Sequence, residues 1–160
     1  MGLFDRLFGF GTKARNEFFV PPAPPSDEEI ARTEAALGVK LPQSFVSFMR
    51  ESRKMKLPPY ARFHWAGDIA AANRQEHEEA GSPLPHFLIT FYNDGMGNQA
   101  CFDTRHARED GEYPIVFWDH ELGPEENLAV VGKPSSHREL AGLVASSFSE
   151  WLHAVYEEAG

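Results

Sequence analysis

Two carboxylates, Asp94 and Asp103, flank a glycine-rich segment at residues 95–97. Facing carboxylates can carry out general acid–base catalysis when burial or a like charge raises the pKa of one of them toward neutrality. Asp94, however, directly precedes a glycine, a context in which aspartate usually accepts hydrogen bonds from turn backbone N–H groups. The glycines open a strand rather than a helix, so they do not form a dinucleotide-binding loop. We therefore expect a structural turn here rather than a catalytic pair.

Seven histidines and one cysteine raise the question of a metal or nucleophilic site. The histidines contain no His-x-x-x-His pair, and a single cysteine cannot form Cys-x-x-Cys. The closest set of ligands is Asp119-His120-Glu121, whose adjacent side chains would point in alternate directions at a strand end and would not converge on one ion. Cys101 lies in an apolar strand pattern, which is typical of a buried thiol. We therefore expect no metal, no cofactor and no enzymatic activity.

The charge of the chain is unevenly distributed. The net charge is −9, and residues 1–60 carry about +2 while residues 61–160 carry about −11. An acidic field repels the phosphate backbone of nucleic acids and attracts cationic partners. The sequence therefore argues against nucleic-acid binding and favours a cationic protein partner, although many proteins are acidic for solubility alone.

The length of 160 residues suits one domain with a single main core. The lone Cys101 cannot form an internal disulfide, no secretory signal pattern is evident, and no apolar run approaches the roughly 20 residues that span a bilayer. We therefore expect a cytoplasmic protein without a transmembrane segment.

Residues 1–25 are predicted to be an appendage of the domain at 26–160. Leu3, Phe4, Leu7 and Phe8 recur at helical spacing, and a stiff proline-rich connector follows at 21–25. Three roles remain open for this stripe: docking on its own domain, self-association into a homo-oligomer, and peripheral membrane contact by residues 3–8.

Helix signals dominate the next part of the domain. Ser26 and Glu29 form a capping-box pattern that predicts a helix at 27–37, which Gly38 ends. Pro42 predicts the start of a second helix with an apolar face made of Phe45, Phe48 and Met49. Asp68 is a plausible N-cap for a polar helix that extends to about residue 79.

Four strands are predicted after these helices, at about 86–92, 99–104, 114–118 and 127–131. Short connections favour an antiparallel arrangement, within a sheet of about four to six strands. The last helix has two competing starts, Ser136 with Glu139 and Ser147 with Glu150, and the later start is preferred. Trp65, Trp118 and Trp151 are expected in the core, although an exposed Trp118 would make a good interface anchor.

Several motifs occur in a characteristic order. They are Leu37-Gly38-Val39-Lys40-Leu41-Pro42 with Phe45 and Phe48, Asp94-Gly95-Met96-Gly97-Asn98 with Cys101-Phe102-Asp103, Pro114-Ile115-Val116-Phe117-Trp118-Asp119-His120, and Ala145-Ser146-Ser147-Phe148-Ser149-Glu150-Trp151-Leu152. Together they resemble the SUKH superfamily of Smi/Knr-type domains over roughly residues 26–156. Many members have an acidic residue where this chain has Asn98.

The resemblance implies an α+β fold and, for many bacterial members, an immunity protein that binds and blocks a toxin, often a nuclease. An acidic surface would suit a cationic toxin domain. The residues expected to form it are Asp94, Asp103, Trp118, Asp119, His120, Glu121, Glu125 and Glu126. Two alternatives stay open: a housekeeping scaffold or regulatory adaptor tethered by the N-terminal segment, and a small hydrolase that uses these carboxylates or histidines.

Overall fold

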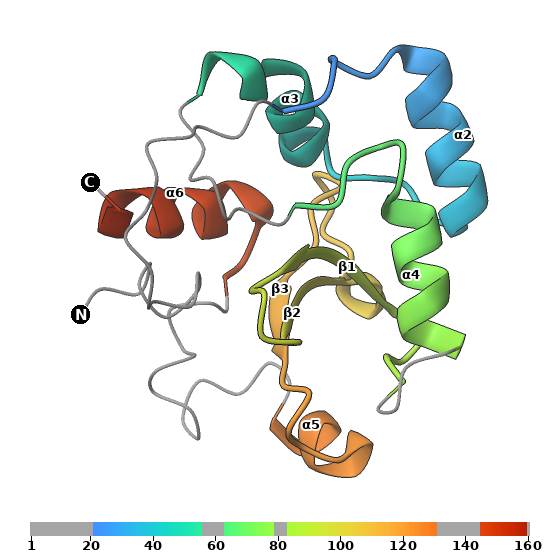
Figure 1. Cartoon of the computed structure of the whole chain (residues 1–160), viewed down its shortest axis with the longest axis vertical. Helices are drawn as coiled ribbons and strands as arrows, with labels where there is room; N and C mark the ends of the chain where they lie inside the picture. The colour runs from blue at the N-terminus through green and yellow to red at the C-terminus, as the bar shows by residue number, and fades with distance from the viewer. Residues whose placement is uncertain (1–20, 56–62, 79–82, 131–144, 160) are drawn as a thin grey trace.

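The computed structural model describes residues 21–55, 63–78, 83–130 and 145–159. The predicted stripe at residues 3–8 and the alternative helix start at Ser136 lie outside these ranges. Figure 1 shows the described elements, which are α2 (Asp27–Leu37), α3 (Gln43–Glu51), η1 (Ser52–Lys54), α4 (Ile69–Glu78), β1 (Leu88–Asn93), β2 (Gln99–Asp103), η2 (Thr104–His106), β3 (Ile115–Trp118), α5 (Pro124–Val130) and α6 (Phe148–Ala159).

The predicted α+β class is confirmed, but the predicted strand count is too high for the described residues. Their sheet has three antiparallel strands in the order β1-β2-β3. The expected fourth strand at 127–131 is wrong, since residues 124–130 form α5. Pro124 suits the first position of a helix, and Glu125 and Glu126 suit the positive end of its dipole.

The helix boundaries follow the local signals in the sequence. Ser26 and Glu29 form the predicted capping box, and Gly38 ends α2 with φ 74°. The later of the two starts is confirmed for α6, because the Ser147 hydroxyl accepts from the N–H of Glu150 at 3.2 Å. Asp68 directly precedes α4, but its carboxylate accepts from the N–H of Trp65 at 2.6 Å.

Two partly buried carboxylates order the chain around α3. Pro42, at the N-cap of α3, has no side-chain cap hydrogen bond of its own. Instead, Glu112 from the loop before β3 accepts from the backbone N–H (3.3 Å) and the hydroxyl (2.9 Å) of Ser44. Glu34 on α2 accepts from the N–H of Leu41 at 3.0 Å. Glu112 and Glu34, which lie outside α3, therefore supply hydrogen bonds at the start of this helix, whereas α2 is capped by its own neighbouring residues.

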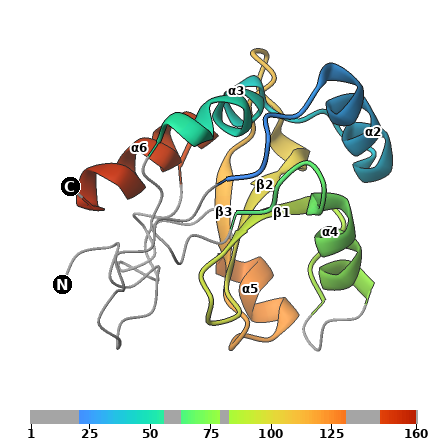
Figure 2. The same ribbon diagram turned by 45° about the horizontal axis from the view of Figure 1, so that its top comes forward.

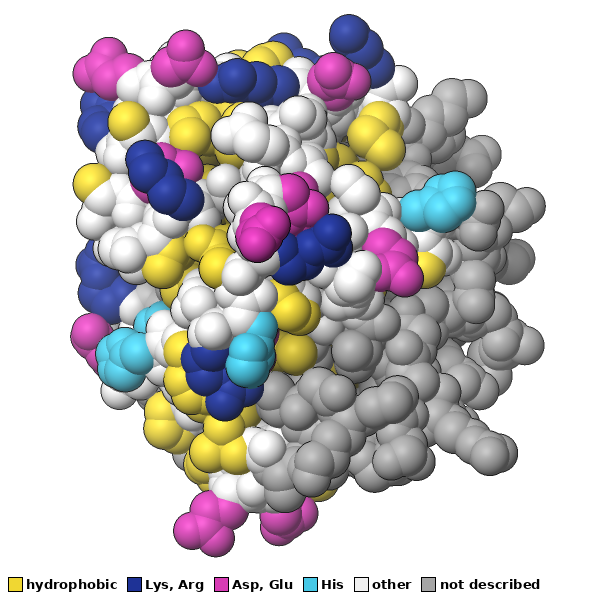
Figure 3. Space-filling view, turned by 180° about the vertical axis from the view of Figure 1, so that it is seen from behind, with side chains coloured by type: hydrophobic (Ala, Val, Ile, Leu, Met, Phe, Trp, Pro, Cys, Tyr) yellow, Lys and Arg dark blue, Asp and Glu magenta, His cyan; other side chains and the backbone are white. Residues whose placement is uncertain are grey.

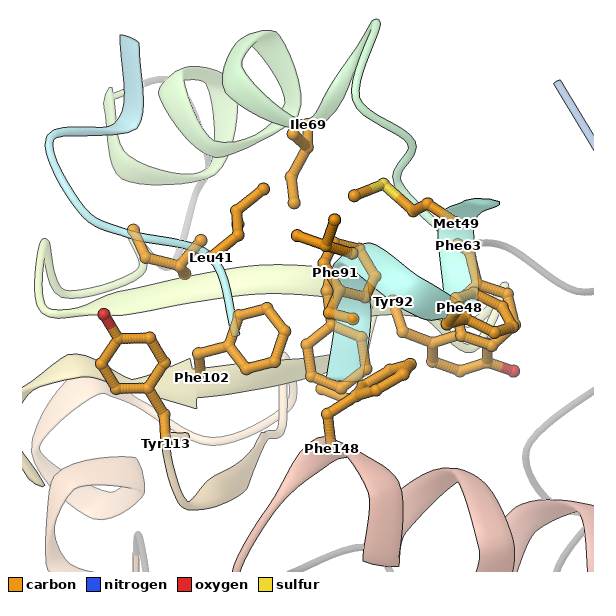
Figure 4. Packing of buried hydrophobic residues seen from close by; sticks show 14 of the residues in the cluster. Leu41, Phe48, Met49, Phe63, Ile69, Phe91, Tyr92, Phe102, Tyr113 and Phe148 are labelled. Carbon is orange, nitrogen blue, oxygen red and sulfur yellow. The ribbon is translucent and has the colours of Figure 1, made fainter. Parts of the chain in front are cut away.

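The main core lies on one face of the sheet, where α3 and α6 cover it (Figure 2). Phe45 of α3 is fully buried, and its ring centroid lies 5.4 Å from that of Phe102 and 5.1 Å from that of Phe148. Figure 4 shows Phe91, Phe102 and Phe148 converging between the strands and α6. Aromatic pairs at these separations add roughly 0.5–1.5 kcal/mol beyond the burial of their area.

The opposite face carries a smaller cluster that includes Cys101 and Trp118. Strand β2 is consequently buried at all five positions. A β-bulge between Thr90 and Tyr92 interrupts the alternation of β1. Because of this extra residue, both Phe91 and Tyr92 join the main core.

Side chains of α4 form hydrogen bonds with backbone groups on the outer edge of β1. This helix lies beside β1 in both ribbon views (Figures 1 and 2). Asn73 accepts from the N–H of Thr90 (2.8 Å) and donates to its C=O (2.9 Å), and His77 Nε2 lies 2.9 Å from the C=O of Leu88. An open strand edge would invite pairing with other chains. Asn73 and His77 thus take the place of a fourth strand along this edge.

Replacing Asn73 by alanine should destabilise the fold, because it leaves buried backbone groups of Thr90 without partners. Such a loss costs about 1–3 kcal/mol. Denaturant unfolding measures it, with Gln75→Ala on the exposed face of the same helix as the control, for which a change within about 0.5 kcal/mol is expected. Equal effects of the two substitutions would contradict the role given to Asn73.

Candidate functional site

The turn at 93–98 and the segment after β3 lie at the same end of the sheet. The register pairs Asn93 with Gln99 and Gln99 with Trp118, so β1 and β3 both end beside the first residue of β2. Segments separated by more than twenty residues in the sequence therefore meet at this end. The loop at 119–123 continues directly into α5.

Asp94 builds the turn, as its sequence context predicts. Its side chain is 5% exposed, and its carboxylate accepts from the N–H of Met96 (2.8 Å), the N–H of Asn98 (3.1 Å) and the side-chain amide of Asn98 (2.7 Å). Gly95 and Gly97 have φ values of 84° and 98°, which disfavour residues with a side chain. The carboxylate is fully engaged within the turn.

Asp103 lies at the other end of the hairpin, where it pairs with Leu88. It is 3% exposed, and Arg105 donates to its two oxygens through Nε (3.0 Å) and Nη2 (2.9 Å). The hypothesis that Asp94 and Asp103 face each other across the hairpin is therefore wrong. Without that pairing the hydrolase alternative loses its acid–base pair.

The turn is fastened to the loop after β3 through Asn98 and His120. The Asn98 Oδ1 accepts from the backbone N–H of His120 at 3.2 Å and lies 2.8 Å from its Nδ1. The imidazole also packs on Gly97, where an added Cβ would lie 3.0 Å from the His120 Cγ. Glycine at position 97 thus serves both the backbone conformation and this close contact.

Asn127 of α5 fastens the same loop from the other side. It is completely buried, its Oδ1 accepts from the N–H of Asp119 at 3.0 Å, and its Nδ2 donates to the C=O of Asp119 at 2.6 Å. The Asp119 carboxylate in turn accepts from the N–H of Glu121 at 2.9 Å. The turn, the loop and α5 therefore form one hydrogen-bonded unit.

Burial divides the predicted partner-binding residues into two groups. Asp94, Asp103 and Trp118 are buried, Trp118 with only 2% exposure, so they do not offer a contact surface. His120, Glu121, Glu125 and Glu126 are exposed, and Asp119 between the two groups is partly buried. Figure 3 shows acidic side chains projecting at the end of the molecule that α5 occupies.

Sequence reasoning missed two apolar residues at this end. Met96 is 51% exposed and Leu128 is 45% exposed, and within the described ranges they are the two large hydrophobic side chains most open to solvent. For Met96 the sequence offered a signal of exposure, because this methionine lies between two glycines of a polar turn. The surface formed by Met96, His120, Glu121, Glu125, Glu126 and Leu128 is called the sheet-end surface below.

Other groups that could carry chemistry are enclosed or already paired. Burial raises the pKa of the Cys101 thiol far above its usual range. The Cys101 thiol is therefore not exposed for reaction. Among the described residues no three His, Cys, Asp or Glu side chains are placed to hold a metal ion.

A cleft of about 430 Å³ lies between α2, α3 and the turn around Asp110. Its apolar wall includes Ile30, Leu41 and Val46, while its charged groups are engaged in the ion pairs Asp27–Arg50, Glu34–Lys40 and Arg108–Asp110. The Asp27–Arg50 pair joins α2 to α3, whereas the other two pairs join residues close together in the sequence.

His64 lies in an environment that disfavours its charged form. Its N–H donates to the C=O of Phe91 at 2.8 Å, and its ring Nε2 is enclosed without a hydrogen-bond partner in the described structure. Burial lowers the pKa of His64, with Asp68 and Gln99 acting in the opposite direction. The ring is thus held neutral inside the fold.

Residues 24–154 match the family model described as the SMI1 / KNR4 family (SUKH-1). The match spans most of the chain and includes every described strand, the helices from α2 to α5 and the first part of α6. It confirms the predicted SUKH resemblance. No match was found among curated proteins. Within the described ranges, no helix has the length and apolar character needed to cross a membrane.

Gly97→Ala should cost about 1–3 kcal/mol, since alanine is strained at this φ and its Cβ meets the His120 ring. Removing the ring with His120→Ala should make the same glycine substitution less costly. Thermal or denaturant unfolding of the four proteins of this cycle measures the difference. Gly67→Ala is the matched control, because no atom lies within 4 Å of the added Cβ. An unchanged cost in the His120→Ala background would show that the ring contact does not couple the turn to the loop.

The lowered pKa of His64 predicts a pH dependence of stability. The unfolded chain binds the proton more readily, so the free energy of unfolding should fall as the pH drops below the ordinary histidine value of 6.5. His64→Gln should flatten this dependence between about pH 7 and pH 5. Gln75→Ala, at an exposed position without a titratable group, is the control and should leave the slope unchanged. A wild-type slope in the His64 variant would contradict the prediction.

Proposed function

Because the chain belongs to the SMI1 / KNR4 family (SUKH-1), we propose that it is a non-enzymatic binding module, an immunity protein that neutralises a cognate bacterial toxin in the cytoplasm. The observation that supports this proposal most strongly is the sheet-end surface. It places three exposed glutamates on a hydrogen-bonded unit of turn, loop and helix.

The carboxylates at this end differ in what they can do. Asp94 and Asp119 accept hydrogen bonds from backbone N–H groups, so they hold the surface in shape. Glu121, Glu125 and Glu126 are exposed, so their charges are free to act on a partner. A toxin that cleaves nucleic acid must carry Lys or Arg where the phosphates bind. Such a basic surface is complementary to the three glutamates.

The first experiment asks whether the chain protects a cell. The C-terminal domain of the secreted protein encoded beside this chain is expressed in a susceptible host, with and without the full chain. We expect growth to be restored and the two proteins to co-purify as a stable complex. Growth arrest that persists despite good expression of the chain, or the absence of any such neighbouring gene, would contradict the immunity role.

Charge reversal then tests the surface. Glu121→Lys, Glu125→Lys and Glu126→Lys together should lower the association rate with the toxin domain by about tenfold or more and reduce its dependence on salt, because exposed charges act mainly through steering. Asp119 is left intact since it holds the loop.

The matched control reverses three exposed glutamates elsewhere, Glu28, Glu51 and Glu78 on α2, α3 and α4. It changes the net charge by the same amount. Equal effects of the two triple variants would mean that only total charge matters and that the partner binds another face.

A second candidate function is that of an adaptor positioned by its N-terminal segment. It is supported by the contacts of the proline-rich connector at residues 21–25. The Arg53 Nε lies 3.2 Å from the C=O groups of both Pro21 and Pro22, and the Arg50 Nε donates to the C=O of Pro25 at 3.4 Å. The connector is thereby fixed along α3 and η1. Deleting residues 1–20 separates the candidates: protection that survives the deletion favours the immunity role, and a loss of localisation or oligomer size favours the adaptor.

A further inference from the structure

We infer that the sheet-end surface is an anchored docking site whose partner presents an apolar socket flanked by Lys or Arg side chains; this rests on the proposed function and adds the chemistry of the partner. Met96 and Leu128 are the proposed anchors, and Glu121, Glu125 and Glu126 form the charged rim. The inference starts from exposure. Met96 is 51% and Leu128 is 45% exposed, whereas the other large apolar side chains that the structure describes are buried or partly buried.

Both anchors are held on rigid backbone. The N–H of Met96 donates to the buried Asp94 carboxylate at 2.8 Å, and Asn98 ties the same turn to His120. Leu128 directly follows Asn127, whose side chain bonds the loop at both Asp119 and Leu122. A preorganised apolar side chain loses little further entropy when a partner covers it, which favours binding.

The glutamates lie next to the anchors. Glu125 precedes Leu128 by three positions on α5, and residues at that spacing share a helix face. Glu121 adjoins His120, which packs against the turn that carries Met96. An apolar centre with a charged rim is the usual arrangement of a protein interface.

Charge complementarity decides among the kinds of occupant. Nucleic acid and anionic lipid surfaces are repelled by the exposed glutamates. A second copy of this chain docked on the same face would bring its own glutamates against these, and like charges in contact are unfavourable. A protein with basic residues around an apolar socket is the occupant that satisfies both the anchors and the rim.

The two groups of residues should affect binding in different ways. Met96→Ser with Leu128→Ser should raise the dissociation rate by about tenfold to a hundredfold and change the association rate little, because buried anchors act on the lifetime of a complex. The exposed Ala36→Ser on α2 is the control and should change neither rate. Because both anchors are exposed, unfolding midpoints should stay near the wild-type value.

The experiment uses the full chain in its native host, with the photoreactive p-benzoylphenylalanine in place of Met96, of Leu128, or of the exposed controls Glu28 and Gln75. Crosslinked peptides are identified by mass spectrometry. The expected result is an adduct from positions 96 and 128 to one protein, within a segment that has Lys or Arg around apolar residues, and its loss in the Glu121, Glu125 and Glu126 charge-reversal background.

The outcomes separate the docking site from the immunity role. If the captured protein has these features but is no toxin, the docking site stands and the immunity role fails. If the chain neutralises a toxin that crosslinks only at position 28 or 75, the immunity role stands and the docking site is wrong. The absence of any adduct at positions 96 and 128, or an adduct to an acidic segment, also overturns the docking site.

Discussion

The outer edge of strand β1 is the constraint on which this structure depends. Within the described residues no full strand extends along it, and a single antiparallel bridge joins Tyr92 to Phe63, so its other backbone groups need different partners. Asn73 and His77 of α4 supply them for Thr90 and Leu88, and the N–H of His64 supplies another for the C=O of Phe91. Since a buried peptide group without a partner costs as much as a lost hydrogen bond, α4 and the segment before it must lie along this edge.

The bulge in β1 follows from the same arrangement. The backbone of Thr90 is hydrogen-bonded to the Asn73 side chain, and its hydroxyl donates to the Gln99 side chain at 2.6 Å. The Thr90 side chain therefore lies away from the main core. The extra residue then turns both Phe91 and Tyr92 toward α3 and α6. With helices across its main face, α4 along one edge and a bridge from Ile115 to Ala145 along the other, the sheet presents mainly its ends. One of those ends becomes the proposed site.

Much of the fold could be predicted from the sequence because its signals are local. The capping box at Ser26, the proline at the start of α3, the glycine turn at 93–98 and the cap at Ser147 each act within about four residues. The strand expected at 127–131 failed although Pro124, Glu125 and Glu126 are local signals that favour a helix there. Its apolar run was compatible with both conformations, and Asn127 supports the helix by bonding back to Asp119 and Leu122.

Some of the residues predicted to form a contact surface differ in exposure from what the sequence indicated. Asp103 and Trp118 were predicted as contact residues because they belong to the family motifs, and both are buried. Burial depends on what covers a residue in three dimensions, which one sequence does not encode at short range. Met96 and Leu128 were missed for the converse reason, since large apolar residues are normally expected inside.

The acidic residues that give the net charge of −9 have two different roles. Glu34, Asp94, Asp103 and Glu112 are consumed by the fold, where they cap a helix, close a turn or pair with Arg105. A partner therefore meets only the exposed carboxylates, and at the sheet end these stand on a rigid frame beside two apolar side chains. Acidic residues that served solubility alone would not need to be held on such a rigid frame. Long-range attraction by the glutamates and short-range burial of the anchors act at different stages of association, so one small surface can supply both speed and lifetime.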